Sequence, residues 1–321
     1  MKAIWITGKG GPDVLQLRNT PDPIPAPGEV LVKVKAAGLN RSDIYSRQSR
    51  SYGNHRPEIP GLEVSGTIVS CGKGVTRWKP RDAVCALVTG GGYAELIAVP
   101  AGQCLPIPQG WTIEEAASLP ETVLTVWSNV WRTAALRAGE TLLVHGGSSG
   151  IGSTAIQLAV AMGNPIYVTA GTDEKCRWCG SLGATRAVNY NSDDFVKAFE
   201  DTGVDVILDM TGGDFTPKNL RVLKNDGRLV LINAMRGREA NIDLTLIMSR
   251  RLVITGSMLK PRSAAFKAEL TADVEERVWP LIARGAIRPL IHACFPLDRA
   301  ADAQRLMESG EHRGKVLLLM S

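Results

Sequence analysis

The sequence predicts an α/β protein that combines a small, mostly β domain with a doubly wound domain built on a parallel sheet. Residues 1 to about 120 are rich in Gly and Pro and carry short apolar segments between turn signals. From residue 122 onward, short apolar strands alternate with helical patterns, and glycines separate the first of these strands from its helix. The 321 residues suffice for two domains of ordinary size.

The first domain is expected to span residues 1–121. The apolar segments 30–36 and 66–69 predict strands, because each is bounded by turn residues. A proline stands at every second position from residue 21 to residue 27. Proline disrupts both a helix and a central strand, so this segment is predicted to be an extended loop.

The second domain is expected to span residues 122–261, with a six-stranded parallel sheet. Strands alternating with helices favour parallel pairing and right-handed crossovers. The predicted strands are 141–145, 165–170, 187–188, 205–209, 228–233 and 251–256, and the predicted helices are 151–162, 174–182 and 215–223. A helix over 263–284, a strand from 287, a helix over 298–309 and a strand over 315–320 follow, and residues 262–321 are expected to return to the first domain.

The charge distribution and the apolar runs exclude several classes of partner. The net charge is +5, and Lys and Arg are scattered along the chain, so no nucleic-acid partner is expected. The apolar runs are too short to cross a bilayer, and the first residues lack the core of a signal peptide. Six cysteines do not look like a disulfide framework. We therefore expect a cytoplasmic protein without a membrane partner.

The strongest local motif is the glycine-rich turn before the helix at 151–162. It has the spacing Gly147-x-Ser149-x-x-Gly152, with Ser in the middle position of the G-x-G-x-x-G pattern and an additional Gly150. Small residues here let backbone N–H groups and the positive end of the helix approach a pyrophosphate. Glycines between a strand and a helix also serve simple tight turns. The predicted pyrophosphate-binding residues are Gly147, Ser148, Ser149, Gly150, Ile151 and Gly152.

The end of the second strand favours NADP over NAD. NAD-binding versions of this fold usually carry an acidic residue here for the ribose 2′-OH, but this chain has Ala170 and Gly171. Their small side chains leave room for a 2′-phosphate, to which Thr172 offers a hydrogen bond and Lys175 a charge. Asp173 argues in the other direction, and Lys175 has an alternative role as a solvated helix residue. NADP(H) is the predicted cofactor.

Several segments resemble the zinc-independent quinone oxidoreductase branch of the medium-chain dehydrogenase/reductase superfamily. They are residues 36–43, 60–72, 91–95, 119–121 and the turn at Gly147. Residues 119–121, 168–171 and 314–316 are closest to the subgroup of the animal tumour-suppressor-inducible quinone oxidoreductase. One departure is Arg81-Asp82-Ala83-Val84, where the family usually has Gly-Asp-Arg-Val. We expect this departure to affect the conformation of a turn more than the catalytic chemistry.

The resemblance implies a GroES-like first domain, a Rossmann second domain and a nicotinamide between them. It also implies a homodimer, or a tetramer, built on the strand 251–256. The zinc-dependent relatives hold their metal with Cys, His and Cys, and the matching positions here are Asn40, Leu62 and Glu121. Leucine does not ligate and no thiolate remains, so no metal is predicted. Without a Lewis acid, an acceptor that takes hydride readily is favoured over a simple aldehyde.

The predicted catalytic residues are Asn40, Asp43, Tyr45 and Tyr52. The Asn40 amide is expected to bind substrate or nicotinamide ribose, with turn stabilisation as the alternative role. Tyr45 lines the substrate pocket or packs, and Tyr52 is the other phenol within reach. Related enoyl-thioester reductases use a tyrosine in this vicinity as proton donor. His145, which precedes the turn, is expected to be packed and hydrogen-bonded.

The resemblance implies further residues around the cofactor. Thr125 should approach the nicotinamide ribose, Asn233 follows strand five, and a plain surface role is the alternative for Lys315. The further predicted cofactor-binding residues are Asn40, Thr125, Tyr190, Asn233, Ser257, Met258, Leu259 and Lys315.

The sequence thus predicts an NADPH-dependent quinone reductase. An enoyl or alkenal reductase is the alternative on the same scaffold, and a NADPH-binding protein with negligible turnover is a third possibility. The physiological acceptor, one-electron versus hydride transfer and the proton donor stay open.

Overall fold

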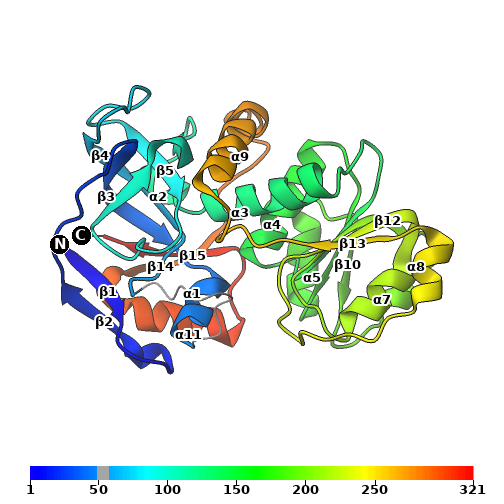
Figure 1. The fold of residues 1–321 in the computed structure, drawn as a ribbon. Coiled ribbons are helices and arrows are strands. Elements are labelled where there is room, and N and C mark those ends of the chain that lie inside the picture. Colours follow the sequence, from blue (N-terminus) through cyan, green and yellow to red (C-terminus); the bar gives the residue numbers. More distant parts are fainter. Residues whose placement is uncertain (49–57, 321) are drawn as a thin grey trace. The chain divides into compact units, whose positions relative to one another are not determined.

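The computed structural model describes residues 1–48 and 58–320. The chain divides into two compact units, Met1–Leu124 with Lys260–Ser321 and Thr125–Leu259 (Figure 1). The first unit therefore combines the two ends of the chain, and the second is one continuous segment.

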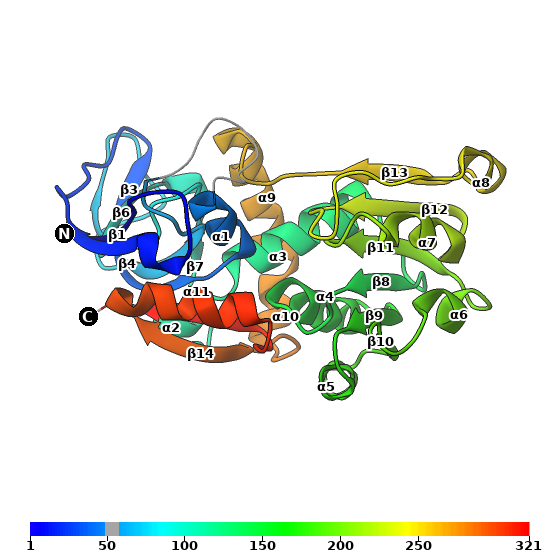
Figure 2. The same cartoon turned by 90° about the horizontal axis from the view of Figure 1, so that it is seen from below.

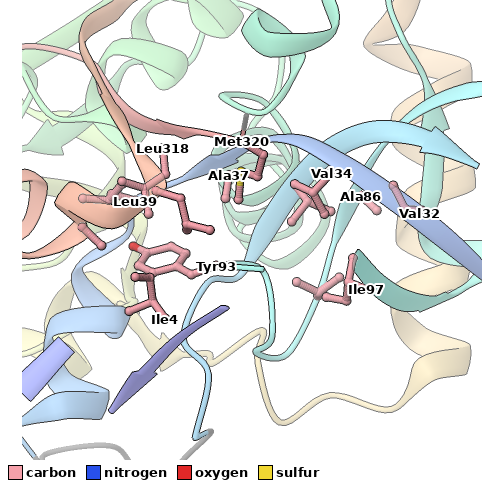
Figure 3. Close-up of a cluster of buried hydrophobic side chains, with 14 of the residues drawn as sticks. Ile4, Val32, Val34, Ala37, Leu39, Ala86, Tyr93, Ile97, Leu318 and Met320 are labelled. Carbon is pink, nitrogen blue, oxygen red and sulfur yellow. The ribbon is translucent and has the colours of Figure 1, made fainter. Parts of the chain in front are cut away.

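A β sheet forms the centre of the first unit. Its strands follow the order β14-β15-β3-β4-β5-β7, and β6 pairs with β3. Their bounds are β3 Glu29–Gly38, β4 Glu63–Cys71, β5 Ala83–Leu87, β6 Leu96–Pro100, β7 Cys104–Pro106, β14 Ile291–Pro296 and β15 Lys315–Leu319; a separate hairpin joins β1 (Lys2–Ile6) and β2 (Leu15–Asn19). Val30, Val32 and Val34 alternate into the core, as the period of a strand requires. Figure 3 shows Val32 and Val34 beside Ala86 and Ile97, with Tyr93 lying against Ile4.

The end of the chain returns to this sheet as an interior strand. Leu318 of β15 pairs antiparallel with Ala37 of β3. Helix α11 (Ala300–Ser309) lies beside α1 (Arg41–Arg47) (Figures 1 and 2). The buried Arg47 joins them, because its Nε donates to Gln304 Oε1 (2.7 Å) and its guanidinium pairs with Glu308.

The remaining helices of the first unit include one departure from the predicted elements. The helix expected over 263–284 is two helices, α9 (Ala264–Arg277) and α10 (Trp279–Ala283). The helix breaks at Val278 because Pro280 has no backbone N–H and fits only the first turn of a new helix. The other helical segments are α2 Ile113–Ala116, α3 Pro120–Val126, which runs into the second unit, and the 3-10 turns η1 Pro12–Val14, η2 Ala101–Gln103 and η4 Leu297–Arg299.

The predicted six-stranded parallel sheet is confirmed in the second unit. Its order is β10-β9-β8-β11-β12-β13, and Figure 2 shows the strands following one another in this order. Their bounds are β8 Leu142–His145, β9 Ile166–Ala170, β10 Arg186–Asn189, β11 Val204–Asp209, β12 Leu223–Leu231 and β13 Val253–Gly256. The helical segments are η3 Trp127–Thr133, a π-helix, α4 Gly150–Ala161, α5 Asp173–Ser181, α6 Phe195–Phe199, α7 Phe215–Val222 and α8 Leu244–Arg250.

Strand β12 differs most from its predicted bounds. It begins at Leu223 and ends at Leu231, whereas residues 228–233 were predicted. Leu223 pairs with Val204 and Arg228 with Val206, so residues 224–227 form an irregularity within the strand. Asp226 there has a φ of 61°, and a Lys-Asn-Asp-Gly sequence is typical of a turn. The sequence pattern therefore predicts a turn where the first half of this strand lies.

Candidate functional site

Most of the predicted cofactor residues of the second unit follow strands that end at one edge of its sheet. All six strands are parallel, so their carboxyl ends share that edge. The glycine turn follows β8, Gly171 and Thr172 follow β9, and Tyr190 follows β10. Asn233 lies two residues beyond β12, and Ser257 comes directly after β13. Ligands of open parallel sheets bind beyond the carboxyl ends of the strands, so this edge is the candidate cofactor site.

The glycine turn is built so closely that side chains are excluded from it. A Cβ added to Gly147 would lie 2.7 Å from Val168 Cβ, and one added to Gly152 would lie 2.3 Å from the Gly146 carbonyl oxygen. Ser149 caps α4, because its Oγ accepts from the Gly152 N–H (3.0 Å) and donates to the Gly146 carbonyl (2.8 Å). This cap explains the serine in the middle of the motif.

The start of α4 fits an anion. The first N–H groups of a helix have no carbonyl partner within it, and the helix dipole places positive potential there. Because Gly147 and Gly152 lack side chains, the turn packs closely on Val168 and on the start of α4. These residues therefore fit a pyrophosphate.

The residues predicted to contact a 2′-phosphate lie together after β9. Thr172 caps α5, and its Oγ1 accepts from the Lys175 N–H (3.2 Å). A Cβ on Gly171 would lie 2.9 Å from the Tyr190 hydroxyl oxygen. Tyr190, which directly follows β10, therefore lies next to this turn. Asp173, whose charge opposes a phosphate, accepts a hydrogen bond of 2.8 Å from Asn189. The absence of a side chain at 171 thus lets the Tyr190 hydroxyl lie against this turn.

A buried polar chain beneath this edge begins at His145. The Asp209 carboxylate accepts from Asn219 Nδ2 (3.0 Å), which turns Asn219 Oδ1 toward His145 Nε2 (2.7 Å). Since Oδ1 only accepts, Nε2 carries the proton, and Nδ1 accepts from the Thr169 hydroxyl (2.9 Å). Burial lowers the pKa of His145. The expectation that His145 is packed and hydrogen-bonded describes this arrangement.

Asp209 also shapes the loop that follows β11. Its carboxylate accepts from the N–H groups of Thr211 (2.6 Å) and Gly212 (3.2 Å). Gly212 and Gly213 have φ values of 64° and 52°, which glycine adopts without strain. Sequence reasoning missed Asp209 and Asn219. An Asp that ends a buried strand before Thr-Gly-Gly is the signal that points to this loop.

In the first unit, Asn40 and Lys315 belong to one buried cluster with Glu63. The Lys315 ammonium donates to Leu39 O (2.7 Å) and Asn40 Oδ1 (2.8 Å) and contacts Glu63 Oε1 at 2.5 Å. Asn40 Nδ2 donates to Glu63 Oε1 (3.0 Å), and Glu63 Oε2 accepts from the Glu121 N–H (2.8 Å). Three acceptors thus surround the three N–H donors of Lys315. A surface lysine, the alternative role, does not describe this buried side chain.

Asp43 lies beside this cluster and is fully enclosed. It accepts from the N–H groups of Asn40 (2.9 Å) and Gly61 (3.0 Å) and from the Tyr93 hydroxyl (3.0 Å). Burial raises its pKa to about 6, and these hydrogen bonds oppose the rise. Figure 3 shows the Tyr93 ring in the core of this unit.

The remaining predicted residues of the first unit are two tyrosines and the positions predicted to match zinc ligands. Tyr45 lies half-buried on α1, and Tyr52 lies outside the described residues. Of the three positions predicted to match the zinc ligands of zinc-dependent relatives, Asn40 uses both ends of its amide inside the cluster. Leu62 is a buried hydrocarbon side chain. Within residues 1–48 and 58–320, no group of three or more His, Cys, Asp or Glu side chains is placed to hold a metal ion.

A pocket of about 560 Å³ opens between α5, β10 and α6, outside the predicted cofactor residues. Its charged lining residues are Asp173, Arg177, Asp193, Asp194 and Lys197. Three carboxylates against two cations disfavour a phosphate, so we assign no part of the cofactor to it. In the part of the chain that the structure describes, no helix has both the length and the apolarity needed to span a membrane.

Comparison with known families matches both units. The profile of the alcohol dehydrogenase GroES-like domain matches residues 26–109, and that of the zinc-binding dehydrogenase domain matches residues 182–318. The second range contains none of the positions 40, 62 and 121. The first match confirms the predicted GroES-like domain.

Two curated relatives and two solved structures cover almost the whole chain. The rat synaptic vesicle membrane protein VAT-1 homolog is 31% identical over 99% of this chain and 84% of its own length. Rat quinone oxidoreductase is 31% identical over 100% of this chain and 98% of its own length. The structure of Escherichia coli quinone oxidoreductase complexed with NADPH has a TM-score of 0.90 at 27% identity, covering 99% of this chain and 100% of that one. The CurK enoyl reductase has a TM-score of 0.89 at 26% identity, covering 100% and 99%.

Proposed function

Since the chain belongs to the quinone oxidoreductase family of the medium-chain dehydrogenase/reductase superfamily, and is thus an NAD(P)-dependent oxidoreductase, we propose that it is a zinc-independent NADPH:quinone oxidoreductase. The observation that carries the proposal is the glycine turn, whose closeness and helix N-terminus fit a pyrophosphate. The likeness to an NADPH complex of a quinone oxidoreductase supports the choice of cofactor and acceptor.

The carboxyl edge of the second unit holds the dinucleotide in this proposal. Residues 147–152 bind the pyrophosphate, while Gly171, Thr172, Lys175 and Tyr190 accommodate the 2′-phosphate. The bound cofactor supplies reducing equivalents from its nicotinamide. Thr125, Asn233 and residues 257–259 position that end of the dinucleotide, and the Asp209 chain holds the loop of residues 211–213 in place.

The first unit binds the acceptor. Asn40, Asp43 and Lys315 are positioning residues, because their polar atoms are bonded to one another and to Glu63 and Tyr93. Tyr45 lines the substrate pocket in this proposal, and Tyr52 is the other phenol within reach of the acceptor. Catalysis then depends on proximity and orientation.

The residues at the metal-ligand positions favour acceptors that are easily reduced. Asn40, Leu62 and Glu121 offer no thiolate and no imidazole, so they do not form the ligand set of a catalytic zinc. A quinone accepts reducing equivalents without polarisation by a Lewis acid. Simple alcohols and aldehydes are poor substrates in this proposal.

An NADPH-dependent enoyl or alkenal reductase is the second candidate, which the likeness to the CurK enoyl reductase favours. It predicts hydride addition to a conjugated C=C bond and loss of turnover in Tyr52→Phe. The quinone proposal predicts a mild effect of that substitution. A NADPH-binding protein without turnover is the third candidate, and it predicts tight binding with no acceptor.

The domain boundaries and the assembly belong to the proposal as well. We place the acceptor-binding domain at 1–121 with 262–321, and the NADP-binding domain at 122–261. Two copies associate through β13, which lies at the edge of its sheet; a tetramer is the alternative.

The test is NADPH consumption against a panel of ortho- and para-quinones and enones, with NADH as the control. Turnover with quinones and NADPH is expected. Turnover with enones alone would favour the second candidate, and activity with NADH alone would contradict the role of Gly171, Thr172 and Lys175. Stoichiometric zinc in an active preparation would contradict the metal-free proposal.

A further inference from the structure

The helix that opens the second unit contains a buried asparagine that the proposed function does not use. Residues 127–133 form the π-helix η3, a rare geometry that often marks functional sites. Asn129, one of its residues, is 1% exposed. Its Nδ2 donates to the Thr125 carbonyl at 2.8 Å.

The bonds of Asn129 coincide with the π-helical geometry. The Thr125 carbonyl, which lies one α-helical turn before Asn129, accepts from the Asn129 side chain. The Asn129 carbonyl then accepts from the N–H of Ala134, five residues on, at 2.9 Å. A side chain inserted into the hydrogen-bond ladder is a known cause of helix distortion. Asn129 thus lies where the helix has bonding to the fifth residue on.

The other end of the Asn129 amide reaches the carboxyl edge of the sheet. Asn129 Oδ1 lies 2.6 Å from Ser257 Oγ, and Ser257 follows β13 directly. Because the Thr125 carbonyl accepts only, Asn129 must present its NH₂ to Thr125 and its oxygen to Ser257. That oxygen accepts only, so the Ser257 hydroxyl must donate its single proton to it. The Ser257 oxygen is left with lone pairs and no proton for any other partner.

We propose that Asn129 is a positioning residue that fixes Ser257 Oγ as a hydrogen-bond acceptor for the carboxamide NH₂ of the nicotinamide. The proposal rests on the proposed function, which places the nicotinamide end of the dinucleotide at residues 257–259. The strand order supports the assignment. With the pyrophosphate at β8 in the middle of the sheet and the 2′-phosphate residues after β9 and β10, the nicotinamide lies on the side of β11, β12 and β13. The Ser257 N–H already donates to the Leu231 carbonyl (3.0 Å). The hydroxyl oxygen, whose proton points to Asn129, is therefore the atom of Ser257 that we assign to the ligand.

The test compares two dinucleotides that differ only in this group. NADPH carries a carboxamide, and its 3-acetylpyridine analogue carries an acetyl group without N–H. Dissociation constants are measured by calorimetry for the wild type, Ser257→Ala and Asn129→Leu. A neutral hydrogen bond contributes about three- to tenfold in affinity. We expect Ser257→Ala to weaken NADPH binding by that factor and to change binding of the analogue by less than about twofold.

Asn129→Leu separates positioning from mere packing. It removes the acceptor of the Ser257 proton, so the hydroxyl is free to donate to the acetyl oxygen. The preference for NADPH over the analogue should then fall by the same factor as in Ser257→Ala. Ser181→Ala, an exposed serine on α5 bonded to the Trp178 carbonyl, should leave both constants unchanged. Affinity for adenosine 2′,5′-bisphosphate, which lacks the nicotinamide, should be equal in all four proteins and reports that the unit is folded.

The results distinguish the two proposals. If the wild type binds NADPH but Ser257→Ala loses equal affinity for both dinucleotides, or for neither, the role of Ser257 is wrong while the proposed function stands. If Asn129→Leu keeps the full preference for NADPH, the positioning role of Asn129 is wrong. If the wild type binds neither NADPH nor adenosine 2′,5′-bisphosphate, the proposed function fails and this inference fails with it.

Discussion

Asp43 carries the clearest pH dependence among single residues of the first unit. Burial raises its pKa from 3.8 to about 6, so the folded state holds this proton more tightly than the unfolded chain. Its contribution to the free energy of unfolding is therefore present below pH 4 and lost as the pH rises through about 6. Replacing it with Asn should cost about 1–3 kcal/mol, because the new NH₂ group faces a donor such as the Gly61 N–H.

The measurement is urea unfolding of the wild type and Asp43→Asn at about pH 4.5 and about pH 7.5. The stability difference between them should be larger at the lower pH. An equal difference at both values would show that Asp43 does not titrate in this range. Tyr93→Phe, which removes one of the three donors to Asp43, should raise the pKa further and shift the transition to higher pH.

His145 offers a prediction about a single proton. The chain from Asp209 through Asn219 requires the proton on Nε2 and a bare Nδ1. Burial lowers the pKa of this imidazole, so its neutral form is favoured more than in an exposed histidine. Nitrogen-15 NMR of the imidazole at about pH 7.5 should show the Nε2-protonated tautomer. Two protonated nitrogens there would contradict the assignment of the chain.

The sequence predicted the surroundings of His145, but it did not predict the hydrogen-bond partners of Lys315 or the role of Asn129. A buried, hydrogen-bonded His145 was expected from its place before the glycine turn. The pairing of Lys315 with Asn40 and Glu63 depends on the return of β15 to β3, which no local pattern encodes. Asn129 was missed because one polar residue in an apolar helix has no periodic signal.

At the scale of elements, we predict the effects of replacing two helix glycines, one near the start of α4 and one near the end of α5. Gly152→Ala would place a Cβ 2.3 Å from the Gly146 carbonyl oxygen, so the turn and α4 must move apart. We expect a loss of about 1–3 kcal/mol in stability and at least about tenfold weaker NADPH binding, since the turn that approaches the pyrophosphate is displaced.

Gly180→Ala is the matched control. Gly180 lies on α5 with no atom within 4 Å of an added Cβ, so alanine should stabilise the helix by about 0.5–1 kcal/mol. Thermal unfolding and calorimetry measure both effects. Normal NADPH binding by Gly152→Ala would refute the role of the turn.

Regular elements were predictable and irregular ones were not. Strands β8, β9 and β11 are short and mostly apolar, so their positions were expected. Strand β12 passes through Asp226 with a positive φ, and its first half resembles a turn in sequence. Pro280 marks the break between α9 and α10, and the single helix predicted over 263–284 did not take it into account.

Assembly is the first prediction for the whole molecule. Strand β13 has a neighbour on one side within the sheet, and Val253 on it is 51% exposed. Exposed edge strands tend to pair with another chain. A carboxylate at this edge disfavours pairing, so Val253→Asp should convert the proposed dimer to a monomer in sedimentation equilibrium. Val69→Asp, the same change at an exposed valine on β4 of the first unit, should leave the assembly unchanged. A wild-type monomer would exclude the proposed dimer.

The two-unit architecture and the cofactor edge could be derived from the alternation of strands and helices and from one glycine turn. The acceptor could not, because the residues of the first unit that were singled out are bonded mainly to one another and Tyr52 lies outside the described residues. Substrate identity depends on side chains that leave no periodic or spacing signal.

The central claim is that the carboxyl edge of the second unit binds NADPH, and the most direct measurement is calorimetric titration of the purified chain with NADPH and with NADH. The account predicts one NADPH per chain and at least about tenfold weaker binding of NADH, because the 2′-phosphate gains charge-assisted contacts. Titrations that show no binding of either dinucleotide would contradict the account.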